Sequence, residues 1–241
     1  MSAMGTIIVV TLRGLLGRRR AILMVLLAAL PILVALLIRV GGGRPDAPEI
    51  LDTLVIRTVL PLIALIVGTA AIGSEVEDGT FVFLLVKPIA RWRIAIAKLT
   101  VASGLTAVLV VPPMLITAAL IGGFAADSVA VAVGFAVAAI AGGAAYACAF
   151  TTLGALTSRA LIVGLAYTLL WEGVLAGLLE GTRFLSIRQA TLGVAGSLTG
   201  VDFRRGALDP AIAVVVLGVV IAGSVVLTTY LLRRFQVRSS D

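Results

Sequence analysis

Long runs of apolar residues, separated by short polar segments, dominate this chain. A run of about 20 apolar residues can cross the hydrocarbon core of a bilayer as an α-helix. The runs lack the alternation of polar and apolar positions that a membrane β-strand requires. The pattern therefore predicts six membrane-spanning helices, at residues 21–40, 53–73, 94–121, 129–156, 160–179 and 211–232.

Two segments outside these spans have a character of their own. Residues 6–20 mix apolar residues with Arg, which is typical of an interfacial helix. A signal peptide is the alternative, but no small-residue cleavage site follows Val40. Residues 180–210 contain apolar patches too short to span, so short re-entrant helices or a folded-back loop both fit. We expect an all-α polytopic membrane protein, a single domain with an interfacial helix within 1–20 and an outer re-entrant element within 180–210.

Small residues recur at four-residue spacing within the predicted spans. This spacing lets the backbones of neighbouring helices approach closely, so we expect these positions to pack within the bundle. They are Gly134, Ala138, Gly142, Gly173, Gly177, Gly218 and Ala222.

The composition agrees with a membrane protein and argues against an enzyme. Hydrophobic residues make up 61% and charged residues 13% of the chain, against about 25% charged residues in soluble domains. The sequence has no His, and neither a metal-ligand cluster nor a nucleophile–base pair is visible in it. The single cysteine, Cys148, lies in an apolar run and excludes a disulfide framework.

The distribution of Arg and Lys predicts the orientation in the membrane. With the N-terminus inside, the cytoplasmic segments hold 12 basic and four acidic residues, and the outer segments hold seven of each. We therefore expect both termini in the cytoplasm, and the basic character requires no nucleic-acid partner. Arg outnumbers Lys by 17 to two, and Ala, Val and Gly are abundant, which hints at a GC-rich bacterial source and hence a bacterial cell membrane.

The most informative polar segment is residues 73–98, GSEVEDGTFVFLLVKPIARWRIAIAK. Thr80 can cap a short apolar helix that Pro88 ends. An apolar face on a cytoplasmic loop needs cover from a protein partner, or from lipid headgroups in the alternative interpretation. We expect a docking element within residues 74–93. Its candidate residues are Glu75, Glu77, Asp78, Gly79, Thr80, Phe81, Leu84, Leu85, Pro88 and Arg91.

This segment resembles the coupling motif of the type-2 (ABC-2-like) permease subunits of ABC transporters. The shared features are the acidic run, Gly-Thr, a Leu pair, Pro, Arg and the trailing Lys98. The resemblance extends over essentially the whole chain. It implies that the helix at 80–87 inserts into an ATP-binding-cassette ATPase, present in two copies, and transmits nucleotide-driven closure. It also implies a second permease copy or a close relative, with ATP and Mg bound by the ATPase.

The chain carries no ATP-binding motif of its own. A Walker loop, GxxxxGK[ST], needs a Lys followed by Ser or Thr. Lys87 is followed by Pro88, and Lys98 is followed by Leu99. We therefore expect no catalytic site in this chain and an ATPase on a separate polypeptide.

Two charges lie inside predicted spans. Glu172 lies near the membrane midplane, where an acid costs about 2.5–3.5 kcal/mol and usually faces a cavity or a partner. Arg57, near the outer end of the second span, is its natural partner. Three hypotheses follow: a structural Arg57–Glu172 ion pair, a protonated and hydrogen-bonded acid at Glu172, or a direct gating or substrate role in the translocation path.

The predicted function is that of the membrane-spanning permease of an ATP-driven exporter. Its substrate would be amphiphilic: an antibiotic, a lipid or a peptide. The alternative is a proton- or ion-coupled secondary transporter that uses Glu172, although no internal repeat typical of such carriers is found. A non-transporting assembly or immunity component with an ATPase partner is also compatible with the sequence.

Overall fold

Helices account for every regular element in the part of the chain that the structure describes. The computed structural model describes residues 11–12, 14–15, 17–43, 45–77, 90–175, 184–201, 203 and 207–238. The elements are α2 (Arg18–Val40), α3 (Ala47–Ile50), η1 (Leu51–Val59), α4 (Leu60–Glu77), α6 (Arg91–Gly122), α7 (Ala126–Leu156), α8 (Ala160–Ala166), η2 (Tyr167–Leu175), α10 (Ile187–Thr199) and α11 (Pro210–Arg238).

Five of these helices are long and apolar enough to cross a membrane. They are Arg20–Val40, Ala47–Gly73, Arg91–Gly122, Ala126–Leu156 and Pro210–Arg234, and they coincide with five of the six predicted spans. The sixth, predicted at 160–179, is matched only by a shorter apolar helix, Ala160–Val174. At 1.5 Å per residue, that helix is about 22 Å long, less than the roughly 30 Å of a bilayer core. Residues 176–183 lie outside the described part, so the count of six is not confirmed.

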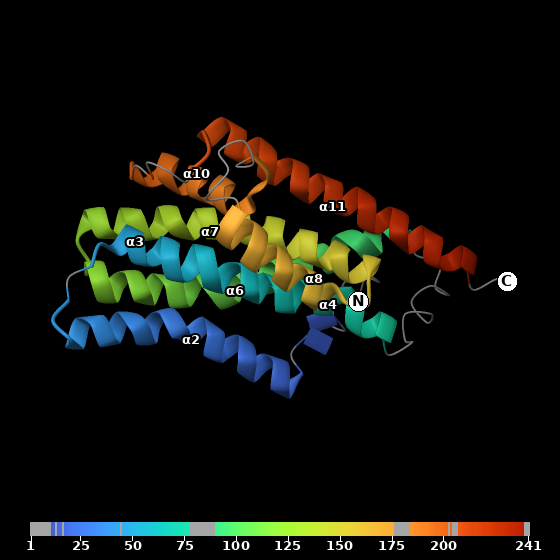
Figure 1. Cartoon of the computed structure of the whole chain (residues 1–241), viewed down its shortest axis with the longest axis horizontal. Coiled ribbons are helices and arrows are strands. Elements are labelled where there is room, and N and C mark those ends of the chain that lie inside the picture. The colour runs from blue at the N-terminus through green and yellow to red at the C-terminus, as the bar shows by residue number, and fades with distance from the viewer. Residues whose placement is uncertain are drawn as a thin grey trace.

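The long helices run side by side around α7 (Figure 1). α7 packs against α4, α6, α10 and α11, while α2 lies at one edge of the bundle and packs mainly against α6. α10 and α11 cover the opposite side of α7 (Figure 1). α2 begins, α4 ends, α6 begins and α11 ends at one end of the bundle, and the α6–α7 turn lies at the other (Figure 1).

Glycines of α7 allow α10 to pack closely against it. A Cβ at Gly142 would overlap the side chain of Thr191, and one at Gly134 would overlap Thr199. Ala138, between them, is completely buried. The packing expected of these three small residues is therefore confirmed. It is not met at Gly218 of α11, where a Cβ would lie within 4 Å of no other described helix.

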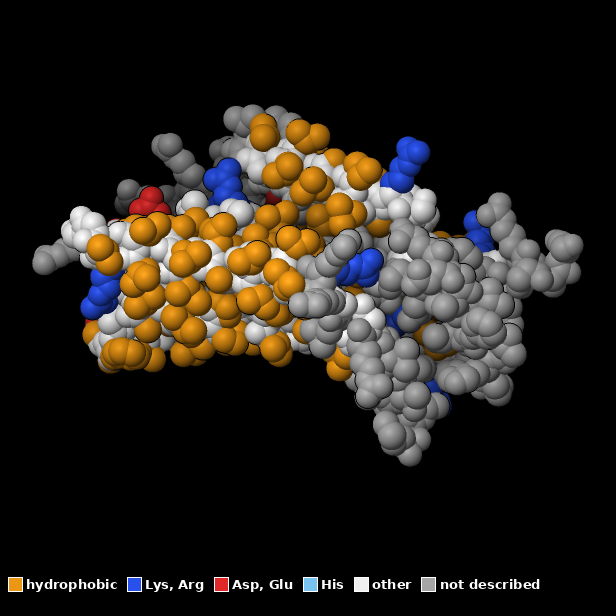
Figure 2. Space-filling view, turned by 90° about the horizontal axis from the view of Figure 1, so that it is seen from below, with side chains coloured by type: hydrophobic (Ala, Val, Ile, Leu, Met, Phe, Trp, Pro, Cys, Tyr) orange, Lys and Arg blue, Asp and Glu red, His pale blue; other side chains and the backbone are white. Residues whose placement is uncertain are grey.

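The outer surface of the bundle is apolar. Figure 2 shows a broad field of hydrophobic side chains, with Lys and Arg side chains at its margins. Leu37 is 72% exposed and Val226 is 70% exposed. A soluble protein rarely exposes an apolar patch of more than a few hundred Å². Lipid is the solvent that suits such a surface.

The two predicted segments outside the spans are only partly described. The interfacial helix expected within 1–20 falls mostly on residues outside the described part, although positions 11, 12, 14 and 15 are helical. The outer segment, 180–210, contains the 13-residue helix α10, which begins at the cap Ser186 and ends at Gly200 in the left-handed conformation (φ 70°). Its insertion into the membrane stays a prediction.

Candidate functional site

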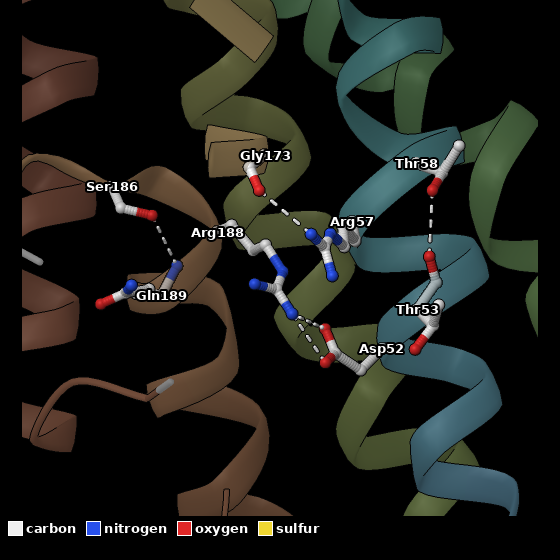
Figure 3. A network of polar contacts seen from close by, with 8 residues as sticks. All are labelled: Asp52, Thr53, Arg57, Thr58, Gly173, Ser186, Arg188 and Gln189. Carbon is white, nitrogen blue, oxygen red and sulfur yellow. Dashed lines mark hydrogen bonds and ion pairs between the residues drawn. The ribbon is translucent and has the colours of Figure 1, made fainter. Parts of the chain in front are cut away.

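Two π-helices, η1 and η2, interrupt the otherwise α-helical bundle. Each covers nine residues, whereas π-helices are usually single turns and frequently lie at functional sites. The two contact each other through Arg57 of η1, whose Nη2 donates to the carbonyl oxygen of Gly173 in η2 at 3.1 Å (Figure 3). This contact joins the start of the second span to the helix that follows α8.

Glu172 of η2 is a buried carboxylate whose oxygens accept three hydrogen bonds. Its side chain is 5% exposed. Oε1 accepts from the hydroxyl of Tyr167 and from the backbone N–H of Ile187, each at 2.9 Å. Oε2 accepts from the hydroxyl of Ser186. A buried carboxylate is tolerated when its oxygens are hydrogen-bonded in this way.

The Glu172 contacts lie at the N-terminus of α10. Ser186 is the N-cap, and its Oγ accepts from the backbone N–H of Gln189 at 3.1 Å (Figure 3) while its hydroxyl hydrogen points to Glu172. A helix N-terminus carries free N–H groups and a partial positive charge, both of which favour a nearby carboxylate. Glu172 belongs to η2, and it therefore adds its carboxylate as a second side-chain partner to the N-terminus of α10, beside the cap Ser186.

Arg188 of α10 forms an ion pair with Asp52 of η1 (Figure 3). Its Nη2 lies 2.9 Å from Oδ1 and 2.8 Å from Oδ2 of the carboxylate. Both side chains are mostly buried, with 16% and 18% exposure. A charge-assisted bond at this depth is stronger than a pair at a water-exposed surface.

These contacts join η1, η2 and α10 pairwise, and we refer to them as the η1–η2–α10 network. Arg57 links η1 to η2, Glu172 links η2 to α10, and the Asp52–Arg188 pair links α10 to η1. The described residues contain no group of His, Cys, Asp or Glu that could hold a metal ion. The arrangement is suited to holding three helices in register.

The ion pair expected between Arg57 and Glu172 is not formed. Both residues are described, and each has another partner: Arg57 donates to the carbonyl of Gly173, and Glu172 accepts from residues of η2 and α10. Arg57 thus reaches the residue next to Glu172 while the carboxylate turns toward the N-terminus of α10. A role of either residue in translocation stays a prediction.

The predicted docking segment is described only at its two borders. Glu75 and Glu77 belong to the last turn of α4, and Arg91 is the first residue of α6. The remaining candidates lie outside the described residues. They are Asp78, Gly79, Thr80, Phe81, Leu84, Leu85 and Pro88.

Sequence reasoning missed several members of the network. Tyr167 and Glu172 are five residues apart, a spacing that an α-helical reading assigns to different faces but that a π-helix brings together. Asp52 and Arg188 were counted only as outer charges. Their opposite signs, with Asp52 beside a predicted span and Arg188 in the outer segment, were a usable signal, but nothing in the sequence selects this pair among seven acidic and seven basic outer residues.

A comparison with protein families supplies the decisive observation. A sequence model of the family described as "ABC-2 family transporter protein" matches residues 16–184. The match covers more than two thirds of the chain. The chain belongs to the ABC-2 transporter family. No curated protein sequence matches it.

Membership in the ABC-2 family agrees with the apolar helices. Together they establish a multi-pass membrane protein of the transporter-permease type. The matched region includes η1, α4, the segment at 73–98 and η2, and it ends before α10. Both π-helices therefore lie in the part that is similar to the family, while the α10 side of the network lies beyond it.

Proposed function

We propose that this ABC-2 protein is the membrane-spanning permease subunit of an ATP-driven exporter, powered by a separate ATPase polypeptide. The observation that carries the proposal is the family match over residues 16–184, which includes the whole segment at 73–98. The sequence contains no Walker loop, so ATP and Mg would be bound by the partner.

In this proposal the ATPase docks on the segment between α4 and α6. The acidic residues from Glu75 to Asp78 face it first, Gly79 and Thr80 start the docking helix, and the helix presents its apolar residues to a cleft on the partner. Arg91 stands at the entrance to α6. Two ATPase copies and two permease copies, or this chain and a close relative, would enclose the path of an amphiphilic substrate.

The proposed topology has six spans with both termini in the cytoplasm of a bacterial cell. The excess of basic residues in the segments next to the termini and at 73–98 supports this orientation. The helix starting at Ala160 would complete the fifth span through residues outside the described part. α10 would then be the re-entrant element on the outer side.

Within this proposal, Glu172 and Arg57 act on the translocation path by positioning helices. Two of the three hydrogen bonds to Glu172 come from the start of α10, which favours a gate in which η2 and α10 move as one unit. A proton-coupled carrier would instead require this carboxylate to bind and release a proton or an ion during each cycle.

The test is purification of the tagged chain from native membranes by gentle extraction, followed by identification of the co-purifying proteins and their ratio. We expect a P-loop ATPase at one copy per permease, lost when Leu84 and Leu85 are both changed to Asp. Phe184→Asp is the control, because Phe184 is an exposed apolar residue outside the docking segment of the sequence. The control should retain the ATPase.

A folded, oligomeric chain that purifies without any ATPase would contradict the proposal. The secondary carrier using Glu172 would then become the leading hypothesis. Transport that depends on the pH gradient and survives the loss of ATP would support that carrier.

A further inference from the structure

Lys98 is completely buried on α6, although it carries an ammonium group within an apolar helix. Its exposure is 0%, and its Nζ donates to the carbonyl oxygen of Ala71 on α4 at 2.7 Å. A buried charged group is costly unless it is hydrogen-bonded, so such a group is held firmly by its partners. The Lys98–Ala71 bond therefore fixes one point of α6 against one point of α4.

This bond lies close to the ends of the two helices. α4 ends at Glu77, six residues after Ala71, and α6 begins at Arg91, seven residues before Lys98. At 1.5 Å per residue, the bond is about 10 Å along the axis from each of these ends. Residues 78–90 connect the two ends. A small cluster of buried apolar side chains packs in the same region, comprising Ile72, Ile94, Ala95, Ala155 and Leu232.

We propose that Lys98 is a positioning residue that makes α4 and α6 respond as one body to the segment between them. This inference rests on the proposed function, in which residues 78–90 carry the ATPase-docking helix. A movement of that helix pulls on the two helix ends that adjoin it, residues 71–77 of α4 and residues 91–98 of α6, which we call the stems. If the stems are joined, the movement passes into the bundle, and if they can separate, their splaying absorbs it.

The test uses the complex of the permease with its ATPase in lipid nanodiscs. A fluorophore is attached to a cysteine placed by Phe124→Cys in a Cys148→Ala background. Phe124 is 87% exposed and lies in the α6–α7 turn, at the end of α6 remote from Lys98. The fluorescence change on trapping with ATP and vanadate therefore reports movement that has passed through the bundle.

We expect Lys98→Met to retain the ATPase in the wild-type ratio and to hydrolyse ATP, but to lose the fluorescence change. Lys98→Arg, which keeps a long cationic donor, should restore it. Arg233→Met is the control, because Arg233 is an exposed cation on α11, outside the docking segment, and it should leave the response intact. A Lys98→Met complex with the wild-type response, or one that loses the ATPase, would overturn the proposal.

Hydrogen exchange of the wild-type complex tests the proposal without any variant, and so covers the case in which Lys98→Met does not fold. The backbone amides of residues 71–77 and 91–98 should stay equally protected with and without trapped nucleotide. A loss of protection on one stem only would show that the stems separate, and the proposal would fail. A wild-type chain that purifies without an ATPase would contradict the proposed function instead. Hydrogen exchange of the two stems in the isolated permease would still show whether the Lys98–Ala71 bond holds them together.

Discussion

Arg188 and Asp52, 136 positions apart in the sequence, form an ion pair that joins α10 to η1. The pair connects an element outside the family match with the beginning of the second span. Each side chain is less than one-fifth exposed, so water screens the attraction weakly. Without this pair, η1 would be linked to the other two elements of the η1–η2–α10 network only through Arg57.

Asp52→Asn should destabilise the protein. The change leaves the Arg188 guanidinium without a carboxylate, and we expect the free energy of unfolding to fall by about 2 kcal/mol. Denaturation followed by tryptophan fluorescence in detergent measures this. Asp127→Asn, which neutralises an exposed acid at the start of α7, is the control and should change stability little. Equal stability of the two variants would show that the pair contributes nothing.

Glu172→Gln should weaken the start of α10. An amide presents only one oxygen, and its NH₂ group faces donors, so at least one of the three hydrogen bonds is lost. We expect a loss of about 1–3 kcal/mol in stability and faster hydrogen exchange at the amide of Ile187. Glu49→Gln, at an exposed acid on α3, is the control. Unchanged stability together with unchanged transport would contradict both the positioning role and a direct role of Glu172.

Hydropathy alone predicted the positions of five candidate spans to within six residues at each end. The span predicted at 21–40 corresponds to α2, and the one at 211–232 lies within α11. Long apolar runs are reliable because the bilayer itself imposes their length and forces the backbone to be helical. The predicted span at 160–179 is matched only by the shorter helix Ala160–Val174, and residues 176–183 lie outside the described part.

The network was beyond the reach of sequence reasoning for two physical reasons. Its Tyr167–Glu172 contact depends on a π-helix, and apolar residues on all sides of a membrane helix leave no periodicity from which its turn could be derived. Its Arg188–Asp52 contact depends on how distant helices pack, which only the folded chain determines. The charge of Glu172 did mark an important position, although the partner expected for it, Arg57, binds the neighbouring carbonyl instead.

Gly142→Val should disrupt the contact between α7 and α10. A Cβ at Gly142 would already overlap the Thr191 side chain, so the added atoms must push the helices apart. Overpacking of this kind costs about 1–3 kcal/mol. Gly218→Val makes the same change in α11 where a Cβ would lie within 4 Å of no other described helix, and we expect it to be nearly neutral in the monomer. Thermal unfolding of the two variants in the same detergent gives the comparison.

A hydrogen bond between Thr152 of α7 and Thr228 of α11 offers a test of the pairing of these two helices. Their hydroxyl oxygens are 2.9 Å apart, and both side chains are buried. Interhelical bonds in membrane proteins contribute about 0.6 kcal/mol on average and up to about 1.7 kcal/mol. The coupling energy between Thr152→Val and Thr228→Val, measured as a double-mutant cycle of unfolding free energies, should fall in this range.

The chain supplies a matched control for this cycle at the next position. Thr229 is also on α11, but its hydroxyl donates to the carbonyl of Val225 in its own helix, so it should show no coupling to Thr152. Coupling that is equal for Thr228 and Thr229 would mean that the effect comes from α11 as a whole. Coupling restricted to Thr228 would assign the coupling energy to the interhelical bond, because Thr228→Val and Thr229→Val each remove one hydroxyl group from adjacent residues of the same helix.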